Sequence, residues 1–123
     1  MNASPESDSV LLNHIRDCIE RVREYTGNRR ATFDHSLLIQ DAVVHNLQIL
    51  AESTQRLSAS IKATEPDVPW EQIAGFRNVL AHGYLQLDAD IVWSVVENDL
   101  PQLAGAIDRM ALATVEKGNS PDV

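Results

Sequence analysis

The most concentrated set of polar side chains that could do chemistry lies between Arg77 and Tyr84. Within it, Arg77, Asn78 and His82 bring together a guanidinium, an amide and an imidazole. A guanidinium binds phosphate through paired hydrogen bonds and keeps its charge. An imidazole takes up and returns a proton near neutral pH. These residue types would suit metal-free cleavage of RNA, in which a ribose 2′-hydroxyl attacks the adjacent phosphorus and Arg77 stabilises the extra negative charge.

The spacing of this set matters because the segment reads as a helix. Asn78 and His82 are four residues apart and share one face. Arg77 and His82 are five apart, which separates them by about 140° around the axis and about 7.5 Å along it. Arg77 must therefore curl towards a shared ligand or meet a group from a second subunit. A plainer alternative stays open on spacing alone, with a capping histidine, a surface arginine and a half-buried Tyr84.

A second polar stripe runs along the segment before this set and contains Asp41, His45 and Glu52. Asp41 and His45 are four residues apart and are neighbours on a helix. Two ligands on one helix do not complete a metal site, and no matching pair recurs elsewhere in the chain. We therefore interpret the stripe as solvated or dimer-facing surface and assign no metal and no cofactor. A metal-dependent hydrolase built on these three residues is the weakest alternative.

Helices must position these side chains, because apolar residues recur at spacings of three and four. The first helix is predicted over about 9–26, with Asp8 or Ser9 as its cap and an end at Gly27-Asn28. The second is predicted over about 34–62. At about 1.5 Å per residue it would be about 40 Å long, which exceeds what a small bundle needs. Part of it should then project or pack against a second chain.

The remaining helices follow from turn and capping signals. Pro69 suits the first turn of a third helix, which ends at Gly83. Asp88 can cap a fourth helix, and Asn98 or Asp99, followed by Pro101, can start a fifth. No segment alternates convincingly at the period of a strand. The expected class is all-α, an antiparallel up-and-down bundle of four to five helices, as one domain over 1–123 with an ordered core of about 9–116.

Composition narrows the class of protein. The chain has 123 residues, one cysteine, and 10 Lys and Arg against 18 Asp and Glu, for a net charge of −8. Such a charge argues against a general nucleic-acid coat protein, although a local basic patch from Arg21, Arg23, Arg29 and Arg30 could still meet RNA. Cys18 lies on an apolar face and is interpreted as a small buried hydrophobe. No membrane span and no signal segment is expected, which favours the cytoplasm.

The chain resembles the HepT-like toxins of the HEPN ribonuclease superfamily over about residues 16–103. The central R-x-x-x-x-H-x-Y motif of that family is present as Arg77, His82 and Tyr84, with the usual polar residue after the arginine as Asn78. Further family-like stretches are Arg23-Glu24-Tyr25-Thr26, Gln40-Asp41-Ala42-Val43, Asn46-Leu47, Val68-Pro69-Trp70-Glu71-Gln72-Ile73, Ile91-Val92-Trp93 and Asp99-Leu100-Pro101.

The resemblance implies a helical homodimer whose two Arg/His pairs meet in a shared cleft and cleave tRNA or mRNA without a metal. Arg77 would bind and stabilise the phosphate, His82 would act as acid and base, and Asn78 would orient one of them. The family often has Gly-Glu-Ala near the end of its second helix. Here Glu52 keeps the acidic residue and is carried over as an accessory residue. Many members have Asp where this chain has Gly83, which removes no catalytic group.

The resemblance also implies a partner, a minimal nucleotidyltransferase antitoxin of the MntA type in a type VII toxin–antitoxin system. That partner would transfer AMP from ATP to Tyr84. An adenylylated phenol adds bulk and negative charge two residues from His82 and would occupy Arg77 in place of RNA. The alternative function is a non-catalytic helical module that partners a nucleotidyltransferase and presents nucleotide or substrate to it.

Overall fold

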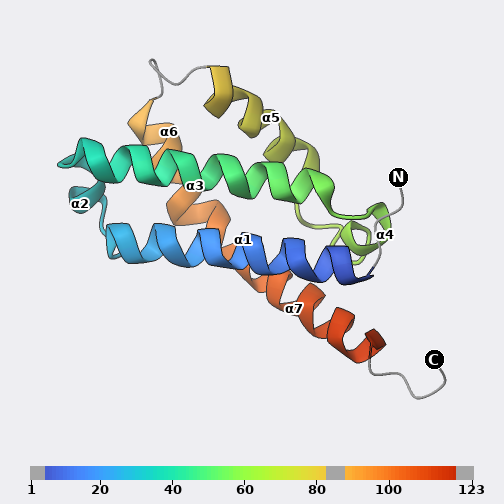
Figure 1. Ribbon diagram of the computed structural model, residues 1–123. Helices are drawn as coiled ribbons and strands as arrows, with labels where there is room; N and C mark the ends of the chain where they lie inside the picture. The colour runs from blue at the N-terminus through green and yellow to red at the C-terminus, as the bar shows by residue number, and fades with distance from the viewer. Residues whose placement is uncertain (1–4, 83–87, 119–123) are drawn as a thin grey trace.

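A computed structural model describes residues 5–82 and 88–118, and every regular element in these ranges is helical. The all-α class predicted from the sequence is confirmed for this part of the chain. In Figure 1, α1 and α3 lie side by side and antiparallel. Helix α5 packs against α3, and α7 crosses α1. The elements are α1 (Pro5–Thr26), α2 (Arg30–Asp34), α3 (Leu37–Arg56), α4 (Ala59–Lys62), α5 (Trp70–His82), α6 (Ala89–Ser94), the π-helical turn η2 (Val95–Asp99) and α7 (Leu100–Gly118).

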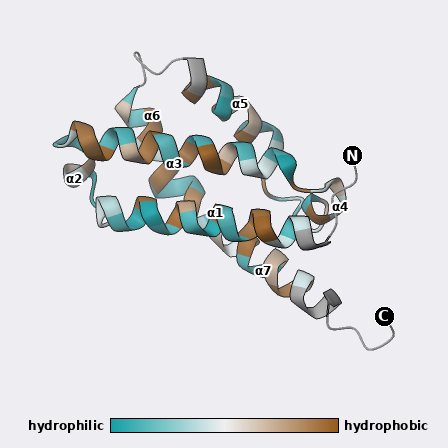
Figure 2. Cartoon of the chain, viewed as in Figure 1, coloured by the Kyte–Doolittle hydropathy of each residue, from teal (hydrophilic) through white to brown (hydrophobic). Residues whose placement is uncertain are grey.

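The core is built by the apolar stripes of α1, α3 and α7, with Leu80 contributed by α5. Figure 2 shows apolar and polar residues alternating along α1 and α3, as expected for helices with one buried face. Each fully buried Leu, Ile or Phe contributes on the order of 2 kcal/mol through removal from water. The largest of these buried side chains are Phe33, Leu12, Ile15, Leu47, Leu80, Ile107 and Met110.

The end of α1 is where the sequence places it. Gly27 and Asn28 both have positive φ, at 59° and 60°. Glycine adopts this left-handed conformation at no steric cost, and asparagine tolerates it better than most residues. The turn sends the chain into α2, where Phe33 is buried and stacks at 5.6 Å on Trp93 of α6.

The single long helix predicted over 34–62 is wrong, because two serines interrupt it. Ser36 has extended backbone angles, and its side chain accepts a hydrogen bond from the Ile39 amide at the start of α3. Ser58 does the same for α4 through the Ile61 amide. The resulting α3 has 20 residues and is about 30 Å long. The argument for a second chain from excess helix length therefore falls away.

The predicted cap at Asp8 or Ser9 is also wrong, since α1 already begins at Pro5. Asp8 instead lies inside the helix, is 5% exposed, and reaches across to the α3–α4 junction. Its carboxylate accepts from the Ser58 amide at 2.9 Å and the Ser58 hydroxyl at 2.7 Å. This contact between residues 50 positions apart holds the break between α3 and α4 against the start of α1.

The predicted fourth and fifth helices join into one bent rod through η2. The expected cap at Asp88 is confirmed, because its side chain accepts from the Asp90 amide. The expected start at Asn98 or Asp99 agrees with α7 beginning at Leu100, but α7 continues from the π-helical turn instead of starting as a separate helix. Leu100 donates to the Val95 carbonyl five residues back, which is the π-helical pattern. Pro101 explains the bend, since its ring excludes the carbonyl four residues before it and it has no amide proton to donate.

Among the described residues, no helix is both long and apolar enough to cross a membrane. Cys18 is buried, as expected, and burial raises the pKa of its thiol.

Candidate functional site

Helix α5 carries the Arg77–His82 set, and its first turn is fixed by contacts to the preceding loop. The Pro69 carbonyl accepts from the Ile73 amide, so this proline stands at the helix start as the sequence predicts. The Trp70 indole donates to the Lys62 and Glu65 carbonyls at 3.1 and 3.2 Å. These bonds anchor α5 to the end of α4.

The same loop is tied to α7 by an ion pair. The Arg109 guanidinium donates through Nη2 at 2.6 Å and through Nε at 3.1 Å to the Glu65 carboxylate. That hydrogen bond lowers the pKa of Glu65. The start of α5 is thereby connected to two other helices, whereas its other end carries the residues of interest.

The faces of α5 follow from burial along the helix. Leu80 is 0% exposed and fixes the rotation of the helix against α3. Ile73 and Phe76, which lie two turns and one turn earlier, are only half-buried. Asn78 is exposed, and Val79 is 51% exposed. The side of α5 that carries Asn78 and Val79 therefore faces away from the bundle of this chain.

Arg77 occupies an unusual position between these faces. Its side chain is half-buried, and its Nε is buried with no hydrogen-bond acceptor among the described residues. A buried donor without an acceptor costs about 1–3 kcal/mol. Such a group in a native fold requires a reason beyond packing. A guanidinium that is retained despite this cost is consistent with a functional role.

His82 is the last residue of α5, so positions 77 and 82 lie on one continuous helix. The angular separation of about 140° expected from the sequence therefore holds for the backbone. The imidazole of His82 and the whole of Tyr84 lie outside the described part of the chain. The proximity of Arg77, His82 and Tyr84 side chains stays a prediction.

The polar stripe on α3 does not form a metal site in the described residues. Asp41, His45 and Glu52 are all exposed, and no group of three His, Cys, Asp or Glu side chains that could hold a metal occurs in that part of the chain. No hydrogen bond or ion pair joins Glu52 to Arg77 within the same ranges. Its accessory role also stays a prediction.

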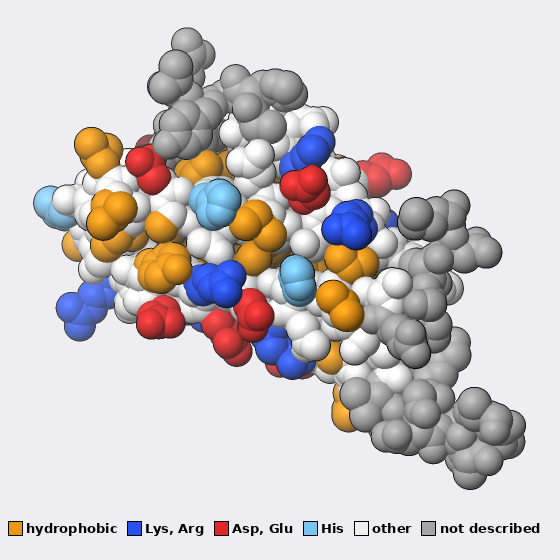
Figure 3. All heavy atoms as spheres, in the orientation of Figure 1, with side chains coloured by type: hydrophobic (Ala, Val, Ile, Leu, Met, Phe, Trp, Pro, Cys, Tyr) orange, Lys and Arg blue, Asp and Glu red, His pale blue; other side chains and the backbone are white. Residues whose placement is uncertain are grey.

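The arginines near the α1–α2 turn do not form an uninterrupted basic patch. Arg30 donates to Asp34 at 3.2 Å and to Asp90 of α6. The bond to Asp90 is the main cause of the raised pKa of Arg30. Arg21 and Arg29 are exposed and form no ion pair within the described residues. Figure 3 shows acidic and basic side chains interspersed on the face it presents.

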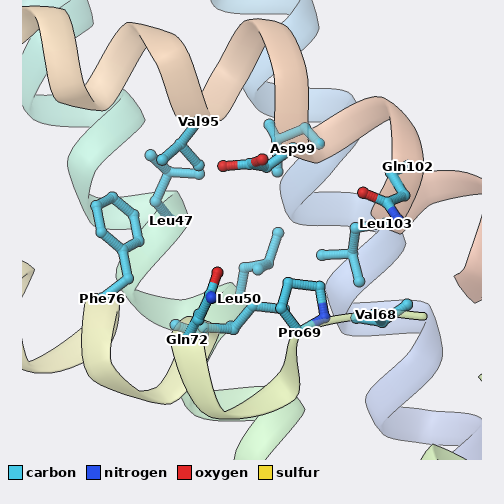
Figure 4. Close-up of a pocket in the computed structure, with 13 residues that line it drawn as sticks. Leu47, Leu50, Val68, Pro69, Gln72, Phe76, Val95, Asp99, Gln102 and Leu103 are labelled. Carbon is cyan, nitrogen blue, oxygen red and sulfur yellow. The ribbon is translucent and has the colours of Figure 1, made fainter. Parts of the chain in front are cut away.

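An apolar groove beside α5, which Figure 4 shows in close-up, is not predicted by the sequence analysis. The groove has a volume of about 230 Å³ and runs between α3, α5 and the η2–α7 bend. Its walls are residues that the helical pattern assigns to the core, such as Leu47, Leu50 and Phe76. Periodicity identifies apolar faces but does not show where two such faces fail to meet.

Comparisons with known proteins converge on one family. The profile described as "Ribonuclease HepT-like" matches residues 15–110. A gamma-glutamylcyclotransferase and candidate RNase of Methanocaldococcus jannaschii is 33% identical over 95 residues, which cover 76% of this chain and 43% of the relative. The probable ribonuclease HepT of Thermococcus cleftensis is 30% identical over 107 residues, covering 85% and 96%. A further candidate RNase of M. jannaschii is 28% identical over 98 residues, covering 80% and 87%.

The chain thus spans less than half of the first of these relatives and nearly all of the second. No solved structure matches the chain.

Proposed function

This chain belongs to the HepT-like ribonuclease family, and we propose that it is the toxin of a type VII toxin–antitoxin pair that cleaves tRNA or mRNA without a metal ion. The observation that supports this most is the family match across residues 15–110, which includes the intact Arg77–His82 spacing on one helix. As part of the same proposal, the protein acts in the cytoplasm as one domain over 1–123.

The chemistry follows from the groups on α5. His82 removes the proton from a ribose 2′-hydroxyl, and the 2′-oxygen attacks the adjacent phosphorus. The bond from phosphorus to the 5′-oxygen breaks, and that oxygen takes a proton from a protonated imidazole. Arg77 stabilises the additional negative charge on the phosphate in the transition state. Asn78 orients the phosphate or the imidazole, with Glu52 as an accessory group.

A homodimer would complete this site. Positions 77 and 82 of one chain lie about 140° apart around the axis of α5, so a cleft between two copies can bring Arg77 of one close to His82 of the other. The side of α5 that carries Asn78 and Val79 faces away from the bundle and is therefore the side on which we place this contact. Val79 is 51% exposed on α5, directly after Asn78. Light scattering should give a dimer mass for the parent protein and a monomer mass for Val79→Asp.

The same proposal assigns Tyr84 as the point of control. A nucleotidyltransferase antitoxin of the MntA type transfers AMP from ATP to the Tyr84 hydroxyl, and pyrophosphate leaves. The added phosphate competes with RNA for Arg77, which silences the nuclease. Co-expression with such a partner should add the mass of one AMP per modified tyrosine, and Tyr84→Phe should prevent the addition.

The test of the nuclease uses purified, unmodified protein, total tRNA and a chelator. We expect cleavage by the parent protein and none by His82→Ala or Arg77→Ala. Matched controls are His45→Ala and Arg21→Ala, which remove an exposed histidine and an exposed arginine outside the proposed site. Cleavage by His82→Ala at the parent rate would contradict the assignment of the acid–base group.

A second candidate is a non-catalytic module that binds a nucleotidyltransferase and presents nucleotide or substrate to it. The net charge of −8 and the ion pairs of Arg30 favour this candidate, because RNA affinity depends on free cations. Absence of cleavage by unmodified protein, together with tight binding to the nucleotidyltransferase, would select it.

A further inference from the structure

The groove beside α5 combines apolar walls with a few polar side chains. Figure 4 shows Asp99 and Gln72 pointing into it from opposite sides, with Gln102 near its rim. Phe76 and Pro69 form its α5 wall. Mostly apolar surface with a small number of directed polar groups is the usual composition of a ligand site.

The three polar side chains of the groove are available to a ligand. Asp99, Gln72 and Gln102 make no hydrogen bond or ion pair with other described residues and are exposed. An ionised carboxylate only accepts hydrogen bonds, whereas an amide both donates and accepts. The complementary ligand must therefore present at least one N–H donor to Asp99 and an acceptor to a glutamine amide.

The shape and charge of the groove restrict the ligand further. The Asp99 carboxylate repels a phosphate, and no Arg or Lys of the described residues lines the groove. A volume of about 230 Å³ is below the roughly 300–1,000 Å³ of sites for drug-sized ligands. A flat, neutral, nitrogen-rich ring such as a single nucleobase fits these limits. Single-stranded RNA is commonly read in this way, by unstacked bases that pack on aromatic rings and hydrogen-bond along their edges.

Guanine matches the polar groups best among the four bases. Its N1–H and 2-amino group are adjacent donors that suit the two oxygens of Asp99. Its O6 accepts from an amide such as that of Gln72. Adenine and cytosine offer an amino group without the adjacent ring N–H, and uracil offers one N–H between two acceptors that a carboxylate repels.

The groove is also close in sequence to one of the proposed catalytic residues, Arg77. Phe76 lines the groove and is followed in α5 by Arg77, about 1.5 Å further along the axis. A base in the groove and a phosphate at Arg77 can thus belong to the same or neighbouring nucleotides.

We propose that this groove is a guanine-binding subsite, in which Asp99 and Gln72 read the base edge and Phe76 packs on the ring. The inference rests on the proposed ribonuclease function and adds a sequence preference to it. RNA cleavage would then occur beside guanosine in single-stranded segments rather than at random.

The test measures binding of labelled heptamer RNAs to full-length His82→Ala protein by fluorescence anisotropy. The RNAs contain only uridine, or uridine with one central guanosine or inosine. We expect the guanosine RNA to bind about 5- to 100-fold more tightly than the uridine RNA, from one bidentate contact. Inosine, which lacks the 2-amino group, should fall between them.

Asp99→Asn provides the decisive variant, because it is isosteric and removes one negative charge. A purely electrostatic role of Asp99 predicts tighter binding of all three RNAs. The subsite predicts instead that the preference for guanosine disappears. Asp17→Asn, an equal charge change at an exposed position on α1, should leave the preference intact. Gln72→Ala should weaken binding of the guanosine RNA and of the inosine RNA by the same factor.

The outcomes separate this inference from the function on which it rests. If tRNA is cleaved in a His82-dependent way but Asp99→Asn keeps the guanosine preference, or no preference exists, the subsite is wrong and the nuclease stands. If no RNA is cleaved and no heptamer binds, the proposed function fails and the subsite fails with it.

Discussion

The α1–α3 half of the bundle and the α5 half are packed in different ways. Ile15 and Val22 of α1 and Val43 of α3 are 0% exposed. On α5, Leu80 alone reaches this burial among the described side chains, while Ile73 and Phe76 remain half-buried beside a groove. The buried Arg77 Nε, which has no acceptor among the described residues, lies on this second half as well. The comparison indicates that α1 and α3 supply stability, whereas α5 keeps polar groups and open surface available for binding.

Among the tests of this difference between the two halves, His82→Ala is expected to have the largest effect, on the rate of tRNA cleavage. Loss of a general acid–base group lowers the rate of a proton-transfer reaction by about 10²- to 10⁴-fold. The rate of tRNA cleavage should therefore fall by this factor, while the circular dichroism spectrum stays helical. His45→Ala serves as the control, and an equal loss in that variant would show that the assay reports general damage.

Core truncation should separate the two halves by stability. Ile15→Ala on α1 removes a fully buried side chain and should lower the free energy of unfolding by about 2–5 kcal/mol. Ile73→Ala on α5 should cost less, because Ile73 is half-buried beside the groove. Urea unfolding of both variants measures the difference. Equal losses would contradict the loose packing of α5.

The next largest effect is expected from removing the contact between α1 and the α3–α4 junction. Asp8→Ala leaves the Ser58 amide and hydroxyl without their acceptor. The expected loss is about 1–3 kcal/mol in the free energy of unfolding. Ser9→Ala, one residue along the same helix, is the control. An unchanged thermal midpoint for Asp8→Ala would show that the contact between Asp8 and Ser58 does not stabilise the fold.

The smallest effect concerns pH and the loop before α5. The hydrogen bond from Arg109 lowers the pKa of Glu65 in the folded protein. Its contribution to stability is therefore present above the unfolded-state pKa of about 4.3 and is lost as pH falls through the folded value. Glu65→Gln should reduce the difference between thermal midpoints at pH 7 and at acidic pH. An unaltered pH profile of the thermal midpoint would show that the Glu65–Arg109 pair does not contribute to stability.

The parts of the fold that the sequence predicts are the helix ends marked by capping and turn residues. Pro69, Gly27-Asn28 and Asp88 mark helix ends through local backbone chemistry, and the structure confirms each of them. The break at Ser58 combines a local serine cap with a contact to Asp8, 50 positions away, and that long-range contact cannot be predicted from local pattern. The π-helical turn before Pro101 likewise arises from how the bend is accommodated rather than from composition.

In the candidate site, too, some features follow from local sequence and others depend on packing. Residue types and spacing select Arg77, Asn78 and His82 as candidates, because their chemistry is intrinsic to the side chains, and their roles stay predictions. Burial of the Arg77 Nε and the groove beside Phe76 are properties of packing and could not be predicted. The roles of Glu52 and Tyr84 come from the family resemblance and stay predictions.

The most direct test of the central claim is tRNA cleavage by Arg77→Met in the presence of a chelator, at equal folded concentration with the parent and Arg21→Met. Methionine keeps much of the apolar stem and removes the buried donor, so the thermal midpoint should be equal or higher. The account predicts that cleavage is lost in Arg77→Met and retained in Arg21→Met. Cleavage by Arg77→Met at the parent rate would contradict it.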